Sequence, residues 1–178
     1  RARVSGFEGE YGQPRGQLLG ADLDYFSSDF LGDRNVSFQA FYVFHTEPFP
    51  DAADTPHSAR RTRGVRFAYP NDVWDYHVSY REFGESWEPA IGFNPRNGFR
   101  RLQPSFSWNP RPGDSDWVRQ YGFGVRFEYL TDLDGLLLTR NLSFDLFQAE
   151  LHSGDEIQLG VGERFERTLD PFTIHPDV

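Results

Sequence analysis

Apolar and polar residues alternate at every second position through most of this chain. Between residues 74 and 81, the even positions hold Trp, Tyr, Val and Tyr, and the odd positions hold Asp, His, Ser and Arg. Residues 121–129 repeat the pattern, with Tyr, Phe, Val, Phe and Tyr sharing one side. Successive side chains of a β-strand point to opposite faces, so this period of two is typical of strands with one apolar and one polar face.

Weaker copies of the same pattern predict further strands along the chain. They lie at residues 19–25, 36–44, 65–69, 102–108, 141–148 and 157–165, and a first strand is expected at 4–11. No segment shows a convincing helical period. We therefore predict an all-β protein, an antiparallel meander of about nine strands.

The composition of the two faces favours an outer-membrane-type β-barrel. The chain is 17% aromatic but only 38% hydrophobic, and the apolar faces are rich in Tyr, Phe and Trp, as in a lipid-facing band with aromatic girdles. The polar faces combine charges with glycines, as at Gly20, Asp22 and Asp24, which suits a wet lumen. A soluble sandwich also alternates, so it stays an alternative on periodicity alone.

The links between these strands differ in length. Short links rich in Gly, Pro, Asn and Asp at 29–34, 70–72, 109–115 and 153–155 alternate with longer ones at 45–60, 84–98 and 131–138. In outer-membrane barrels, short turns face the periplasm and long loops face outside. An odd count near nine does not close a bacterial barrel. We therefore expect residues 1–178 to be a single β-barrel domain, a fragment of a larger barrel.

Charge and residue types exclude several function classes. The net charge of -9 argues against nucleic acid as a partner, because phosphate binding needs a basic face. The chain has no Cys, which excludes a thiolate metal site and a cysteine nucleophile. Its five His residues lack any metal-binding spacing. We expect no metal, no other cofactor and no catalytic residue.

The candidate site consists of polar side chains that would line the lumen or contact a ligand. On the strands these are Arg63, Arg66, Asp75, His77, Arg126 and Glu128. In the 84–98 loop and just after it they are Glu85, Trp87, Glu88, Arg96, Arg100 and Arg101. Trp87 and Trp117 have two interpretations: stacking on a glycan, or packing in the loop for Trp87 and at the membrane interface for Trp117.

Residues 74–112 also resemble a known family. The stretches Phe83-Gly84-Glu85, Trp87-Glu88-Pro89, Ile91-Gly92-Phe93 and Asn109-Pro110-Arg111-Pro112 are similar to the central motif of the DUF5916 domain, an uncharacterised bacterial family. Ala90 and Asn94 depart from that motif. The resemblance implies an outer-membrane β-barrel that follows an amino-terminal carbohydrate-binding domain in the parent chain.

Together, these observations predict a non-catalytic domain in the outer membrane of a Gram-negative-type bacterium, surrounded by the lipid bilayer. Its expected role is anchoring, or forming a passage for, a polysaccharide-related function, with a carbohydrate as ligand. Two alternatives stay open. One is a glycoside hydrolase that uses a carboxylate pair such as Asp22 and Asp24, about 6–7 Å apart on one strand face. The other is a soluble carbohydrate-binding β-protein.

Overall fold

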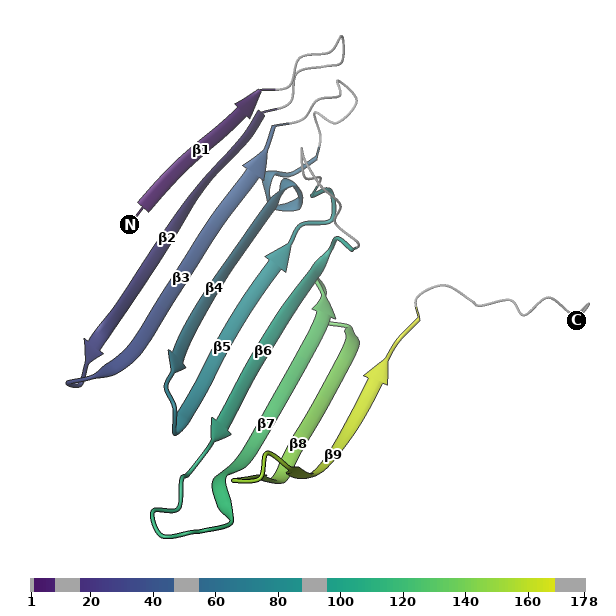
Figure 1. Cartoon of the computed structure of the whole chain (residues 1–178). Helices are drawn as coiled ribbons and strands as arrows, with labels where there is room; N and C mark the ends of the chain where they lie inside the picture. The colour runs from purple at the N-terminus through teal and green to yellow at the C-terminus, as the bar shows by residue number, and fades with distance from the viewer. Residues whose placement is uncertain (1, 9–16, 47–54, 88–95, 169–178) are drawn as a thin grey trace, which may run out of the picture.

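The computed structural model describes residues 2–8, 17–46, 55–87 and 96–168 (Figure 1). Its strands are β1 (Ala2–Glu8), β2 (Gln17–Phe30), β3 (Arg34–His45), β4 (Arg61–Pro70), β5 (Trp74–Phe83), β6 (Phe99–Trp108), β7 (Val118–Asp132), β8 (Leu137–Leu151) and β9 (Glu156–Glu166). A single turn of 3-10 helix, η2 (His57–Arg60), precedes β4. No helix in the described ranges has both the length and the apolar character needed to cross a membrane.

The strands form one antiparallel sheet in chain order. Strands β2 to β9 are an eight-strand meander in which each strand pairs with the next, and the backbone of β1 pairs with β2 at the sheet edge. The predicted all-β class and the antiparallel meander are confirmed. The sheet is not closed into a barrel: within the described residues, β9 pairs only with β8. Part of the first strand expected at 4–11, residues 9–11, lies outside those residues.

The connections lie at two ends of the sheet (Figure 1). The turns after β2, β4, β6 and β8 gather at one end, here called the turn end. The last residues of β3, β5 and β7 and the first residues of β4, β6 and β8 lie at the opposite end, here called the loop end. The long link predicted at 131–138 is wrong, because it is a tight turn. The Asp132 carboxylate accepts backbone N–H bonds from Asp134 (3.0 Å) and Leu136 (2.7 Å), and Gly135 adopts φ 92° there.

The strand register sorts side chains onto two different faces. Directly paired residues share a face, so Tyr76 lies beside Phe106 on an apolar face and His77 lies beside Ser105 on a polar one. The apolar face continues across the meander with Leu19, Leu23, Phe38, Val65, Val78, Leu102, Phe127, Leu142, Phe144 and Val161. The predicted alternation therefore becomes two faces of opposite character.

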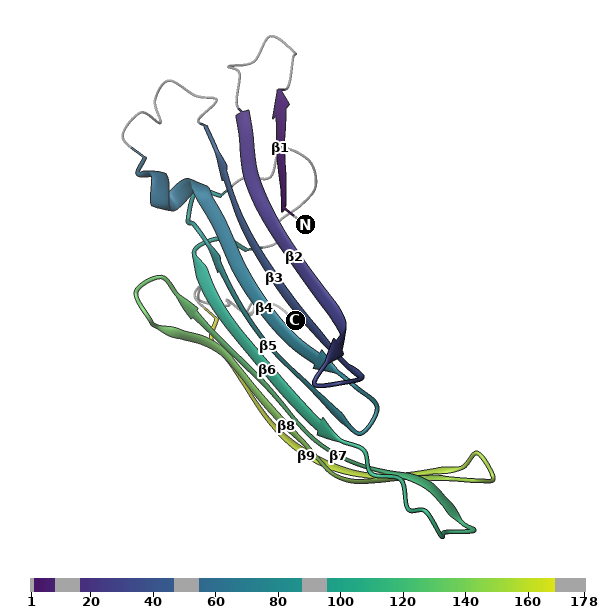
Figure 2. The same cartoon turned by 90° about the vertical axis from the view of Figure 1, so that its left-hand side faces the viewer.

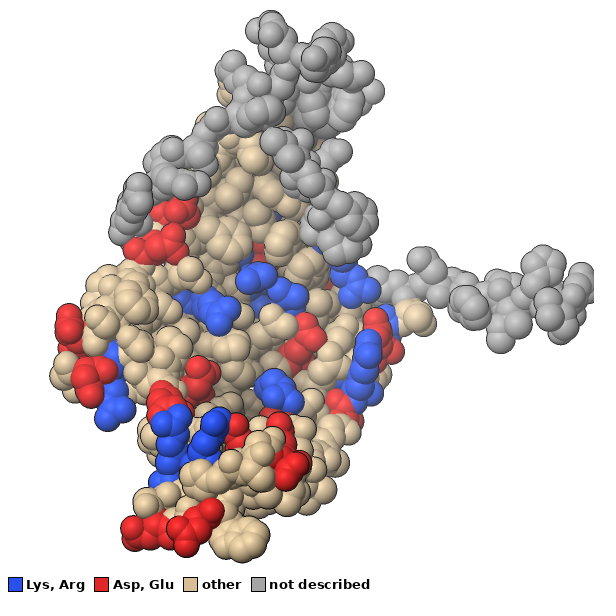
Figure 3. Space-filling view, in the orientation of Figure 1, with Lys and Arg blue, Asp and Glu red and all other residues tan. Residues whose placement is uncertain are grey.

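The apolar face is the more exposed of the two. On β5, Val78 of the apolar face is 42% exposed, whereas its neighbour Ser79 of the polar face is 6% exposed. The sheet is curved (Figure 2), and the polar face lies on its concave side, where Figure 3 shows Arg, Asp and Glu side chains over the middle of the sheet. A soluble protein buries its apolar residues, and this sheet does the reverse.

Buried apolar side chains are few in the described part of the chain. Phe99, Leu130 and Leu138 form a small cluster, against which Phe83 packs. The rings of Phe83 and Phe99 stack with centroids 4.8 Å apart. This cluster lies at the loop ends of β5 to β8.

Candidate functional site

Glu128 is the centre of a hydrogen-bonded network on the polar face of β6 to β8. Its carboxylate accepts bonds from the side-chain amides of Gln103 (3.0 Å) and Asn141 (2.8 Å), and it lies 4.0 Å from the Arg101 guanidinium. The register brings Gln103 of β6, Glu128 of β7 and Asn141 of β8 to one level, and Arg101 lies two residues away along β6. The network links three strands through side chains as well as through their backbones.

Two further polar pairs cross neighbouring strands on this face. Arg126 donates two hydrogen bonds to Asp145, at 2.7 and 3.1 Å, a forked geometry that holds a guanidinium in a fixed plane. Ser105 Oγ lies 2.7 Å from His77 Nδ1. These pairs satisfy polar groups that a lipid-facing or core-facing surface would leave unpaired.

Three arginines gather on the polar face at β4, β5 and β6. Arg81 lies directly opposite Arg101, and the charges of Arg101 and Arg66 both repel that of Arg81. Like charges opposite each other destabilise a sheet. Among the described ion pairs, this arginine cluster (Arg66, Arg81 and Arg101) meets one carboxylate, Glu128. A ligand with hydrogen-bond acceptors could offset the repulsion among these three guanidiniums.

A hollow of about 230 Å³ lies beside the arginine cluster and is here called the polar hollow. Its polar lining is Asp22, Asp24, Gln39, Arg66 and Arg81. The two carboxylates come from β2 and the two guanidiniums from β4 and β5. Gln39 donates a 3.0 Å hydrogen bond to Asp24. Charges of opposite sign therefore stand on opposite sides of the polar hollow.

The aromatic side chain of Phe41 also lines the polar hollow. Its ring lies across Gly64 of the next strand, where an added Cβ would come within 2.6 Å of Phe41 Cε1. Because glycine has no Cβ, residue 64 leaves room for this ring to lie against the sheet. A flat ring among carboxylates, an amide and guanidiniums can stack on one side of a sugar ring while the polar groups bind its hydroxyls.

The structure places five of the six predicted strand residues on the polar face. Arg66, Asp75, His77, Arg126 and Glu128 lie there by register. The prediction that Arg63 accompanies them is wrong. Residues 63 and 66 are three apart on one strand, and a period of two sends such residues to opposite faces.

Arg63 belongs instead to a charged group at the loop end of the apolar face. There Glu82 pairs with Arg63 (3.1 Å), Arg100 (3.1 Å) and Arg61 (3.6 Å), and it accepts a 3.0 Å hydrogen bond from the Tyr80 hydroxyl. The Glu82 side chain is 8% exposed. We call these five residues the Glu82 cluster.

The predicted loop residues do not form one site. Arg100 is part of the Glu82 cluster, whereas Arg101 lies on the polar face. Trp87 is 6% exposed and lies beside the His45 ring, with centroids 5.7 Å apart. Its packing interpretation is therefore supported over glycan stacking.

The remaining predicted residues lie near strand ends or in the 84–98 segment. Trp117 is 79% exposed, next to the start of β7. Glu85 is exposed and Arg96 half-buried near the ends of the described loop segments. Glu88 lies outside the described residues.

Three residues of the polar hollow were not among the sequence-predicted site residues. Phe41 occupies a polar-face position, and an aromatic residue out of phase with its strand was a signal that could have singled it out. Gln39 and Arg81 sit in phase on their strands, so only the pairing of strands shows that they share a hollow with Asp22 and Asp24.

No protein-family model, no curated protein and no solved structure matches this chain. The resemblance to the DUF5916 domain therefore stays a prediction.

Proposed function

We propose that this chain is part of a β-barrel in a bacterial outer membrane, with its polar face toward an aqueous lumen and its apolar face toward lipid. The observation that carries the proposal is the exposure of the apolar face relative to the polar one. Large exposed apolar surfaces on a folded protein mark contact with a membrane or another protein. A face that extends over eight strands fits a bilayer better than a local partner.

Strand length supports the same proposal. The paired strands from β2 to β9 are 10 to 15 residues long, and a tilted strand needs about 9–11 residues to cross the hydrocarbon core. The open edge of β9 would be intolerable in lipid. The proposal therefore requires further strands, from elsewhere in the parent protein or from another subunit, to close the barrel.

The polar hollow supports a carbohydrate as the molecule that binds in or passes through this lumen. Its opposed charges favour a solute rich in hydroxyl groups over an apolar one, and Phe41 provides a ring for stacking. The role is binding or passage without catalysis, in support of a polysaccharide-related function of the parent protein. A neighbouring carbohydrate-binding domain, implied by the family resemblance, would be part of the same function.

Gel mobility of the full-length protein tests the barrel. We expect it to fractionate with the outer membrane and to run faster in detergent before boiling than after, because a closed barrel keeps its fold in detergent until it is heated. A water-soluble protein without a heat shift would contradict the proposal and favour the soluble alternative.

Substitution of Phe41 tests the carbohydrate ligand. Full-length protein in a planar bilayer should show ion conductance that neutral and acidic oligosaccharides block. Phe41→Ala should weaken the block, since the variant lacks the aromatic ring on which a sugar would stack. Phe106→Ala, which removes a ring from the opposite face, is the matched control and should leave the block unchanged. Equal block in both variants would exclude Phe41 from the site. Hydrolysis of an oligosaccharide that is lost in Asp22→Asn or Asp24→Asn would replace the proposal with the hydrolase alternative.

A further inference from the structure

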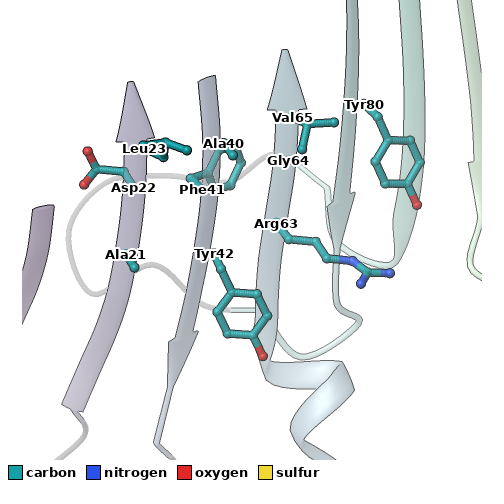
Figure 4. A pocket seen from close by; sticks show the side chains of 10 residues that line it. All are labelled: Ala21, Asp22, Leu23, Ala40, Phe41, Tyr42, Arg63, Gly64, Val65 and Tyr80. Atoms are coloured by element: carbon teal, nitrogen blue, oxygen red, sulfur yellow. The ribbon is translucent and has the colours of Figure 1, made fainter. Parts of the chain in front are cut away.

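A second, larger hollow lies on the apolar face over β2, β3 and β4, and Figure 4 shows the side chains around it. Its volume is about 600 Å³, within the range of small-molecule sites. The side chains of Ala21, Leu23, Ala40 and Val65 form the apolar part of its lining. Asp22, Phe41 and Gly64 also border it, and the register assigns these three residues to the opposite, polar face. We call this space the apolar hollow.

The apolar hollow forms where two alanines stand among larger side chains in two neighbouring rows of the sheet. Ala40 stands between Leu23 and Val65 in the sheet register, and Ala21 stands beside Tyr42. Toward the turn end, the equivalent positions carry Tyr25, Phe38 and Phe67. The methyl side chains of the two alanines leave a depression that the aromatic residues around it do not fill.

The loop end of the apolar hollow is polar. Tyr42, Arg63 and Tyr80 line it there, and Arg63 and Tyr80 belong to the Glu82 cluster. Three guanidiniums meet one carboxylate in that cluster, so its formal charge is three positive less one negative, or +2. The Arg63 side chain is 46% exposed, which leaves part of its guanidinium accessible beside the hollow.

We propose that the apolar hollow binds an anionic membrane lipid, with an acyl chain along Ala21, Ala40 and Val65 and its phosphate group at Arg63. The inference rests on the proposed function, in which this face meets the bilayer. Arg63 points its Nε and Nη2 toward Glu82, so its remaining N–H groups would donate to the phosphate. The Tyr80 hydroxyl donates to Glu82, and the Tyr42 hydroxyl adds a further donor. An apolar slot with a positively charged end complements a molecule with an acyl chain and an anionic head.

The level of Arg63 on the sheet agrees with this occupant. The Glu82 cluster lies beyond the apolar residues of β4 and β5 toward the loop end, where a lipid-facing strand would reach the headgroup region. Anionic lipid headgroups attract Arg at that depth. A lipid site here would prefer anionic headgroups, whereas the rest of the apolar face would not. This preference can be measured.

Native mass spectrometry of the detergent-solubilised full-length protein tests the proposal. The probes are dioleoyl phosphatidic acid and dioleoyl phosphatidylcholine, which share acyl chains and differ in headgroup charge. We expect one molecule of phosphatidic acid to stay bound under conditions that remove phosphatidylcholine. Ala40→Phe, which fills the hollow, should reduce this retention about tenfold or more, whereas Val78→Phe adds the same ring elsewhere on the apolar face and should not.

Two charge variants test the headgroup contact. Arg63→Gln should lower phosphatidic acid retention about tenfold, the scale of one lost charge-assisted hydrogen bond. Arg140→Gln is the matched control, because Arg140 lies on the same face in an ion pair with Glu163 at 2.5 Å and is 43% exposed. It should retain the lipid as the unaltered protein does.

The heat shift on gels separates the two ways of failing. If all variants keep the heat shift but Ala40→Phe and Arg63→Gln bind phosphatidic acid like their controls, the lipid site is wrong and the barrel stands. Equal retention of phosphatidic acid and phosphatidylcholine by the unaltered protein would also overturn the site. If the protein shows no heat shift and is water-soluble, the proposed function fails and the lipid site fails with it.

Discussion

At the scale of single residues, Glu82 determines the charge balance at the loop end of the apolar face. Its position follows from the alternation on β5, since it shares a face with Trp74, Tyr76, Val78 and Tyr80. A carboxylate there would be isolated on an apolar surface without the arginines of β4 and β6. The structure supplies them through pairing, with Arg63 on one side and Arg100 on the other.

Glu82→Gln should therefore destabilise the fold. The change leaves three neighbouring guanidiniums without their shared carboxylate, and the expected loss is about 1–3 kcal/mol, the usual cost of leaving hydrogen-bonded charged groups unpaired. The measurement is the urea concentration at which the protein loses its folded mobility on unheated gels.

Glu163→Gln provides the control for that measurement. Glu163 pairs with Arg140 but is 61% exposed, and exposed ion pairs contribute about 0–1 kcal/mol. A urea midpoint of Glu82→Gln equal to that of Glu163→Gln would show that the Glu82 cluster does not stabilise the sheet.

At the scale of strands, aromatic residues mark the turn end of the apolar face. Trp108 of β6 stacks on Trp74 of β5 and Phe123 of β7, with centroids 5.6 and 5.3 Å apart. Tyr69 and Tyr76 stack beside them at 4.9 Å. In the proposed barrel, such a row at one end of the apolar face would form an interfacial girdle.

Trp108→Ala should lower stability by about 1–3 kcal/mol, because each aromatic pair contributes roughly 0.5–1.5 kcal/mol beyond its area. Trp117→Ala removes a ring of the same size that is 79% exposed in the adjoining turn, so it should change stability by less than about 0.5 kcal/mol. Urea midpoints of the two variants in lipid vesicles give the comparison. Similar midpoints would mean that the stacked row does not hold β5, β6 and β7 together.

Strand existence could be predicted from the sequence because alternation is a local property. The ends of the strands are harder to predict from the sequence. Strand β4 begins at Arg61, whereas the alternation predicts a start at residue 65. Residues 61–64 are three polar residues and a glycine. Neither face of this segment is apolar, so the sequence shows no alternation there. Their pairing with β3 and β5 makes them a strand.

At the scale of the whole molecule, the arginine cluster and the polar hollow depend on how neighbouring strands are paired in register. The sequence of one strand alone does not determine that register. The arginine cluster joins residues 66, 81 and 101, and the polar hollow joins β2 to β5. Periodicity could predict which residues share a face of one strand, as for Asp22 with Asp24. It could not predict that Arg81 lies opposite Arg101, because a shift by two residues would preserve both faces and change every pair.

A pair of single-cysteine variants would show which face of the sheet meets lipid and which meets water. The chain has no Cys, so Val78→Cys on the apolar face and Ser107→Cys on the polar face each offer one site of labelling on neighbouring strands. Both replacements are close in size to the original side chain. The full-length protein, labelled with a polarity-sensitive fluorophore in vesicles, is then exposed to lipid-borne and water-soluble quenchers.

We predict that the label at residue 78 is quenched by nitroxide lipids and has blue-shifted emission, while the label at residue 107 is quenched by iodide from the water. That result places the apolar face in lipid and the polar face in an aqueous lumen. If iodide instead quenches the label at residue 78 as strongly as the label at residue 107, or nitroxide lipids quench neither, the apolar face does not meet the bilayer and the proposed barrel is wrong.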